Sequence, residues 1–174
     1  MRWHQIDTMT CSVARTLSVI GDRWTMLIIR DVFLGVRKFD AIQQDLQLTP
    51  HRLSDRLRKL VRDGVLRRVA YEKRPPRYEY RLTEKGFDLY PLLATMTAWG
   101  DRWMAGRRGV PVELVHRPCG RTITPELVCP CCQAKIDARE MIAQPGPALQ
   151  GRVLPGQDTP SPRRMIARNI EKTA

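Results

Sequence analysis

The stretch "RKFDAIQQDLQLTPHRLSDRLRKLVRDG", residues 37–64, decides the fold. Its apolar residues recur every three or four positions in two runs: Phe39, Ile42 and Leu46, then Leu53, Leu57, Leu60 and Val61. This spacing places apolar side chains on one face of an α-helix. Two such helices separated by a short turn are the sequence pattern of a helix-turn-helix.

The turn between these two runs carries a helix start signal. Thr49 supplies a hydroxyl that can cap the second helix, and Pro50 follows where no backbone N–H is needed. The free N–H groups at the start of this helix, together with Thr49, could hold a phosphate. The second helix is therefore expected to begin at Pro50 and to present its polar face to a partner.

The flanking segments complete a winged fold. Residues 12–34 predict two short helices broken near Gly21. Residues 65–72 and 78–83 alternate apolar and polar side chains as strands do, and the basic turn "KRPPR" between them cannot continue a ladder. A helix over 84–105 follows Thr83, whose hydroxyl can cap it, and Pro91 is expected to kink this helix or to lie near its first turn. The predicted fold is mainly α with a small β-hairpin, a winged helix-turn-helix.

Charge is concentrated in the helix and hairpin. The chain of 174 residues has a formal net charge of +12. Residues 50–81 hold eleven basic and four acidic side chains, so they carry more than half of that excess. An Arg-rich helix exterior is often only a solvated surface, but its combination with a basic hairpin favours a nucleic-acid partner. The low aromatic content, 6%, argues against an RNA-binding protein that stacks bases.

The sequence shows no secretory or membrane-targeting signal, and we expect a cytoplasmic protein. No apolar stretch approaches the roughly 20 residues that span a bilayer, and the N-terminus lacks the apolar region of a secretory signal. Thiols stay reduced in the cytosol, and an odd number of cysteines, five, does not suit a closed disulfide framework. We therefore expect no membrane association and no structural disulfides.

Four cysteines cluster in "HRPCGRTITPELVCPCCQ", residues 116–133. Two pairs have the two-residue gap of zinc ligands: His116 with Cys119, and Cys129 with Cys132. Four protein ligands leave no open position, so the site is expected to be structural rather than that of a zinc enzyme using Glu113 or Glu126. Cys131 is left over, and a redox cluster in which it attacks a neighbouring sulfur is the alternative.

Several motifs together resemble the HxlR-type family of winged helix-turn-helix transcription regulators. They are "CSVARTLSVIGDRWTMLIIRDVFLGVRKFDAIQQDL", "TPHRLSDRLRKLVRDGVLRR", "RPPRYEYRLTEKG" and "WGDRW", in order over residues 11–104. The resemblance implies a bacterial, homodimeric regulator that binds double-stranded DNA and is not an enzyme. In such proteins the helix after the turn enters the major groove and the wing contacts the DNA backbone or the minor groove. Dimerisation would use the first helix and the helix over 84–105.

The resemblance also assigns positions. The reading-helix positions are Thr49, His51, Arg52, Ser54, Arg56, Arg58 and Lys59, and the wing-tip positions are Lys73, Arg74 and Arg77. Cys11 matches a cysteine that senses oxidants in some members of the family, while a capping or packing role is the alternative. A similar His/Cys tail occurs in a subset of the family.

The expected domain layout has three parts. Residues 1–109 form the winged domain with its dimerisation helices, 110–142 a zinc-ribbon-like appendage, and 143–174 a flexible tail rich in Pro and Gly. A cavity between the dimerisation helices and the winged domain could take a small-molecule effector, whose chemistry the sequence does not specify.

Overall fold

The computed structural model of the protein describes residues 3–149, which fall into two compact units that meet between residues 124 and 125 of the chain. Each unit is considered by itself. Residues 150–174, which make up most of the predicted tail, lie outside the described residues, as do residues 1 and 2.

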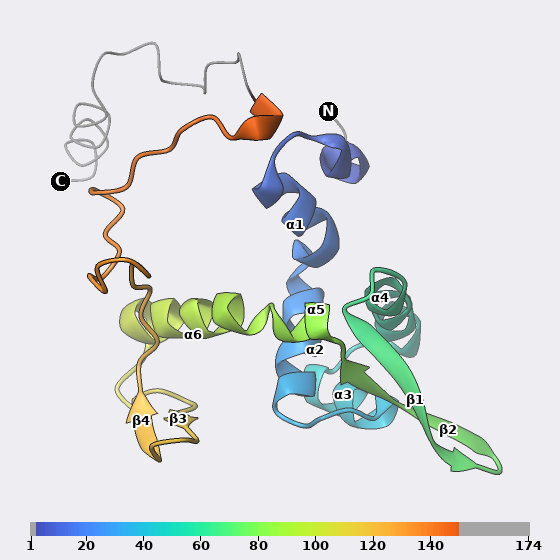
Figure 1. The fold of residues 1–174 in the computed structure, drawn as a ribbon. Helices are drawn as coiled ribbons and strands as arrows, with labels where there is room; N and C mark the ends of the chain where they lie inside the picture. The colour runs from blue at the N-terminus through green and yellow to red at the C-terminus, as the bar shows by residue number, and fades with distance from the viewer. Residues whose placement is uncertain (1–2, 150–174) are drawn as a thin grey trace. The chain divides into compact units, whose positions relative to one another are not determined.

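Helices dominate the first unit, in which one hairpin separates the fourth and fifth α-helices and a second hairpin follows the last helix (Figure 1). In chain order the elements are η1 (Trp3–Thr8), α1 (Ser12–Ile20), α2 (Arg23–Phe33), α3 (Phe39–Leu46), α4 (Pro50–Arg62), β1 (Leu66–Lys73), β2 (Pro76–Leu82), α5 (Glu84–Phe87), α6 (Tyr90–Met104), β3 (Leu114–His116) and β4 (Arg121–Ile123). The predicted mainly helical fold with a small antiparallel hairpin is confirmed.

Local signals set the ends of α2, α3 and α4. The carboxylate of Asp22 accepts the N–H of Trp24 at 3.0 Å and caps α2. Gln47 ends α3 in the left-handed conformation, with φ of 51°. Leu48 then turns into the core, and α4 starts with Pro50 in its first turn, as the sequence predicted.

The core lies where α2, α3 and α4 meet the base of the β1–β2 hairpin. Leu53, Leu57 and Leu60 of α4 are fully buried, which confirms the predicted stripe at these three positions. Val61 is 36% exposed, so its place in that stripe was wrong. On α2, Ile29 is fully buried although the helical pattern did not single it out. Trimming one such buried leucine to alanine typically costs about 2–5 kcal/mol, so α4 is firmly anchored.

The wing is an antiparallel pair in which Leu66 faces Leu82 at the base and Lys73 faces Pro76 at the tip. The N–H of Tyr80 donates to the carbonyl of Arg37 at 2.8 Å, which ties β2 to the loop before α3. Beyond β2, the Thr83 hydroxyl accepts the N–H of Gly86 at 3.1 Å, so the predicted cap is confirmed.

The helix predicted over 84–105 is divided in two. α5 ends at Phe87 and α6 begins at Tyr90, with Pro91 in its first turn, where a missing N–H costs nothing. Only Ala94 of α6 is buried, and Trp99 and Trp103 are 58% and 64% exposed. Within the described residues, no helix is both long enough and apolar enough to cross a membrane.

Candidate nucleic-acid interface

The start of α4 is exposed and open. The Thr49 side chain makes no capping hydrogen bond, so the predicted hydroxyl cap was wrong, and the first turn of α4 contains no acidic residue. Arg52 is exposed and has no hydrogen-bond or ion-pair partner among the described residues. Free N–H groups, an unbonded hydroxyl and an unpaired guanidinium together form an anion-binding surface.

Further along α4, basic side chains pair with acids of the same helix or its end. His51 Nδ1 lies 3.2 Å from Asp55 Oδ2, and Arg58 Nη2 lies 3.2 Å from Asp55 Oδ1. Lys59 pairs with Asp63. The two pairs that Asp55 makes are exposed and contribute about 0–1 kcal/mol each, so a phosphate can replace this carboxylate at low cost, whereas the Lys59–Asp63 pair is half-buried.

Arg56 and Ser54 face the scaffold more than the solvent. Arg56 Nη2 lies 3.1 Å from Oδ2 of Asp22, the residue that caps α2. Ser54 is half-buried, and its carbonyl accepts a hydrogen bond from Arg58 Nε at 3.4 Å. The structure therefore places Arg56 at the contact between α4 and α2, where its guanidinium already has a partner, whereas Arg52 has none among the described residues.

The wing tip presents the second group of predicted residues. Lys73 and Arg74 are exposed and have no acidic partner among the described residues, whereas Arg77 Nε lies 3.4 Å from Glu72 Oε2. Arg74 and Pro75 form the turn and are joined by a cis peptide bond. The unpaired cations at the tip suit contact with a phosphate backbone.

The structure also brings together basic residues that lie outside the predicted DNA-contacting set. Arg67 and Arg81 face each other across the wing and, with Arg37, line a cavity of about 240 Å³. The guanidinium of Arg68 lies 3.5 Å from the centre of the Tyr78 ring. Strand register could have suggested the opposed pair, but the approach of Arg37 depends on the tertiary fold.

The distribution of ion pairs divides the eleven basic side chains of residues 50–81 into two sets. The four acids of this segment, with Asp22, pair with Arg56, Arg58, Lys59, Arg77 and Arg81. Six have no acidic partner among the described residues: Arg52, Arg62, Arg67, Arg68, Lys73 and Arg74. The excess positive charge therefore lies on α4 and on the wing.

A family model described as HxlR-like helix-turn-helix matches residues 19–108, which include α2 to α6 and every predicted DNA-contacting residue. The chain belongs to this family. The HxlR-like match confirms the resemblance seen in the sequence, and it covers just over half of the 174 residues.

Relatives of this HxlR-like chain are named HTH-type transcriptional regulators. Rv3095 of Mycobacterium tuberculosis is 41% identical over 142 residues, 82% of this chain and 90% of the relative. YdeP of Bacillus subtilis is 35% identical over 98 residues, 56% of this chain and 77% of the relative. The family model ends at residue 108, but the match to Rv3095 is 142 residues long, which is more than the whole stretch from residue 1 to residue 108. The match to Rv3095 therefore continues beyond the part of the chain that the family model covers.

The solved structure of PA1607 is 35% identical to this chain, with a TM-score of 0.72, and the match covers 82% of this chain and 99% of PA1607. PA1374 from Pseudomonas aeruginosa is 36% identical, with a TM-score of 0.55 over 79% of this chain and 94% of PA1374. Both structures match well over half of this HxlR-like chain, so the likeness is not confined to the helix-turn-helix.

The His/Cys segment lies across the boundary between the two compact units. In the first unit, His116 Nδ1 is 3.4 Å from Cys119 Sγ, and the N–H groups of Cys119 and Gly120 donate to the His116 carbonyl. No group of three or more His, Cys, Asp or Glu side chains among residues 3–149 could hold a metal ion. The structure therefore does not support the predicted zinc-ribbon appendage as an assembled site.

In the second unit, Cys129 closes a small turn, with its N–H donating to the Ala134 carbonyl at 2.8 Å. Backbone N–H groups of Cys132 and Cys131 donate to the Cys129 sulfur and lower the pKa of that thiol. All five cysteines are free. Cys11 is half-buried at the N-cap of α1 and makes no side-chain capping bond, so its sensing role stays a prediction.

Proposed function

We propose that this HxlR-like protein is a transcriptional regulator that binds double-stranded DNA sequence-specifically as a homodimer. The observation that carries the proposal is that unpaired cations lie on both DNA-facing elements of a winged fold, with Arg52 on α4 and Lys73 and Arg74 on the wing. Family membership and relatives named as regulators support it, and they favour a regulator over an enzyme.

In this proposal α4 enters the major groove. A single α-helix fits that groove, and Arg52 near its start can bind a guanine edge while the free N–H groups bind a phosphate. Arg58, Lys59 and His51 exchange their acidic partners for phosphates or base edges. The wing contacts the backbone, where Lys73 and Arg74 supply charge without reading sequence.

The homodimer is supported by apolar side chains that the single chain leaves uncovered. Val13 of α1 is 68% exposed, and Met96, Trp99 and Trp103 of α6 recur at helical spacing with about half or more of each exposed. Monomeric proteins rarely expose such a group of large apolar side chains. A second copy of the chain would cover both helices.

The test is a selection of duplex sites from a random pool, followed by titration of the best site by fluorescence anisotropy at several salt concentrations. The logarithm of the binding constant should fall steeply with the logarithm of salt concentration. Arg52→Ala should weaken binding to the selected site by about 1–3 kcal/mol per contact and relax its sequence preference. Lys73→Ala should weaken selected and unrelated duplexes equally and reduce the salt slope.

Arg108→Ala is the matched control, because Arg108 lies outside α4 and the wing. It should change the salt slope and the affinity much less than Arg52→Ala does. A chain that prefers no duplex over another, or whose affinity does not respond to salt, would contradict the proposal.

We further propose that His116, Cys119, Cys129 and Cys132 bind a structural zinc ion. The donor types suit zinc, and backbone N–H groups directed at the Cys129 sulfur favour the thiolate that the metal requires. When bound, the ion would contribute folding free energy to a segment that has no buried apolar core of its own.

Metal content, measured after purification without chelators, tests this second proposal. We expect about one zinc ion per chain, lost in Cys119→Ser and Cys129→Ser. Cys131→Ser is the matched control and should keep its zinc, which also separates Cys131 from Cys132 as a ligand. Metal-free protein that folds identically with and without added zinc would contradict the assignment.

A further inference from the structure

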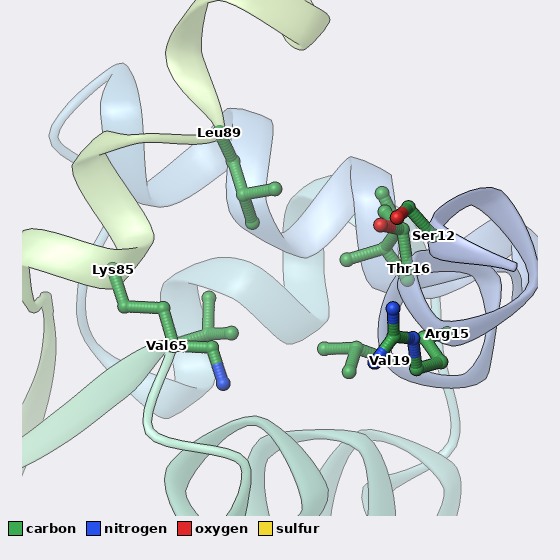
Figure 2. Close-up of a pocket in the computed structure, with 8 residues that line it drawn as sticks. Ser12, Arg15, Thr16, Val19, Val65, Lys85 and Leu89 are labelled. Carbon is green, nitrogen blue, oxygen red and sulfur yellow. The ribbon is translucent and has the colours of Figure 1, made fainter. Parts of the chain in front are cut away.

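A cavity of about 390 Å³ lies between α1 and the base of the wing (Figure 2). Ser12, Arg15 and Thr16 line it from α1, while Lys85 of α5 and Leu89 enter from the opposite side, as Figure 2 shows. Cavities that bind small organic molecules have volumes of about 300–1,000 Å³. The size therefore suits a small ligand.

The chemistry of the lining is that of a site for an organic anion. Among the described residues that line the cavity, two are charged, Arg15 and Lys85, and both are basic. Arg15 has no ion pair among the described residues. Lys85 Nζ donates to the Asp63 carbonyl at 2.8 Å, which uses one of its three N–H donors and leaves its charge unneutralised.

The remaining walls are mostly apolar. Val65 is 1% exposed and Ile20 is 5% exposed, and Val19 and Leu89 are half-buried beside them. Ser12 and Thr16 add two hydroxyl groups on the side of Arg15. Two cations and two hydroxyls above apolar walls fit a ligand with one anionic end and an apolar body.

We propose that this cavity binds a small organic carboxylate of about the size of benzoate, with Arg15 and Lys85 holding the carboxylate group. The apolar body lies against Val65 and Leu89.

The position of the cavity indicates what the ligand does. Val65 directly precedes β1, and Lys85 and Leu89 belong to the segment that joins the wing to α6. A carboxylate that bridges Arg15 and Lys85 fixes α1 relative to the base of the wing. This effect rests on the proposed DNA-binding function, whereas ligand binding itself does not. We expect saturating benzoate to change the Kd for the selected duplex by about threefold or more.

Benzoate is the probe, and its binding to the full chain is followed by shifts of backbone amide signals in NMR spectra. The expected Kd is on the order of 1 mM, with shifts at Val65 and Leu89. Arg15→Gln and Lys85→Gln should each weaken binding about fivefold, and Arg108→Gln should not change it. Benzyl alcohol, which lacks the charge, and acetate, which lacks the apolar body, should both bind more weakly than benzoate.

Three results would overturn the site: no shifts at about 20 mM benzoate, well above the expected Kd; equal binding of benzoate and benzyl alcohol; or unchanged binding in the Arg15→Gln, Lys85→Gln double variant. Duplex binding without benzoate is measured on the same samples. Benzoate bound at the cavity with no duplex bound would reject the proposed function alone. Duplex binding with no benzoate bound would reject the cavity site alone, and both binding with an unchanged duplex Kd would reject the coupling.

Discussion

Replacing Gly86 with alanine should loosen the wing from the helical core. Gly86 is buried in α5, and an added Cβ would lie 2.3 Å from the Val65 carbonyl oxygen and 2.9 Å from Leu82 Cδ2. The leucine side chain can shift, but the carbonyl belongs to the backbone that leads into β1. The same carbonyl accepts the N–H of Thr83 at 3.1 Å and, at 3.2 Å, shares the Thr83 hydroxyl proton with the nearer Gly64 carbonyl at 2.6 Å. Relief of the clash must therefore stretch these hydrogen bonds.

Three effects set the size of the destabilisation. Overpacking a filled site costs about 1–3 kcal/mol. Weakening the hydrogen bonds to Val65 adds up to about 1 kcal/mol each. Against these, alanine is favoured over glycine within a helix by at most about 1 kcal/mol. The net expectation is a loss of about 2 kcal/mol in the free energy of unfolding, or about 4–8 °C in Tm for a chain of this size.

Urea unfolding followed by tryptophan fluorescence measures the change. Gly100→Ala in α6 is the matched control, because nothing lies within 4 Å of the Cβ it would add. This variant should gain up to about 1 kcal/mol from helix propensity alone. Measurements at two protein concentrations separate folding from any effect on association. A Gly86→Ala variant within about 0.5 kcal/mol of the wild type would refute the packing argument.

Three further substitutions test an ion pair, a buried carboxylate and an exposed tryptophan. Arg56→Ala removes the ion pair with Asp22 and should lower the free energy of unfolding, measured in urea, by about 0.5 kcal/mol. In the anisotropy assay it should weaken duplex binding less than Arg52→Ala does. Burial raises the pKa of Asp31 above its ordinary 3.8, and this effect is larger than the lowering by Arg30. The wild type therefore loses stability as the pH rises from 3.8 through that raised pKa. When unfolding is measured from pH 3.5 to 7, Asp31→Asn should gain stability relative to the wild type as the pH rises. Trp99→Glu should give a folded monomer by analytical ultracentrifugation and circular dichroism, and an unchanged dimer would contradict the proposed interface.

The parts of the fold that depend on local patterns could be predicted from the sequence. The leucines of α4 repeat at helical spacing, and their burial follows directly from that repeat. Thr83 caps the helix that follows it, and Pro91 lies in the first turn of its own helix, so both roles could be predicted from the order of residues along the chain. Thr49 had the same signal as Thr83, but its hydroxyl makes no capping bond.

Features that depend on distant contacts could not be read in this way. Asp31 is 1% exposed, although a charged residue gives no sequence signal for burial. Its carboxylate accepts from Arg30 Nε and Nη2, and that guanidinium also reaches Asp45 of α3 at 2.8 Å. On α2, apolar residues surround more than one face, so the pattern alone could not separate buried Ile29 from half-buried Trp24.

The distinction between Arg52 and Arg56 shows why site residues were harder to assign than the helix that carries them. Both are arginines on the polar side of α4, one turn apart, and sequence spacing treats them alike. Only the fold brings Asp22, from the start of α2, within 3.1 Å of Arg56. Because a paired guanidinium must give up an existing partner before it binds a phosphate, the unpaired Arg52 has more to gain from DNA.

The same reasoning applies to the whole basic surface. Every acid of residues 50–81 is already paired with a neighbouring base, so the charge that attracts DNA rests on the six unpaired side chains. Three of these, Arg62, Arg67 and Arg68, lie outside the set that the family resemblance selected. If counterion release drives binding, substitution of these three should reduce the salt slope as much as substitution of Arg52, Lys73 and Arg74. If only the substitutions of Arg52, Lys73 and Arg74 reduced the salt slope, the absence of an acidic partner would not decide which cations contact the DNA backbone. Their position at the wing tip and at the start of α4 would decide it instead.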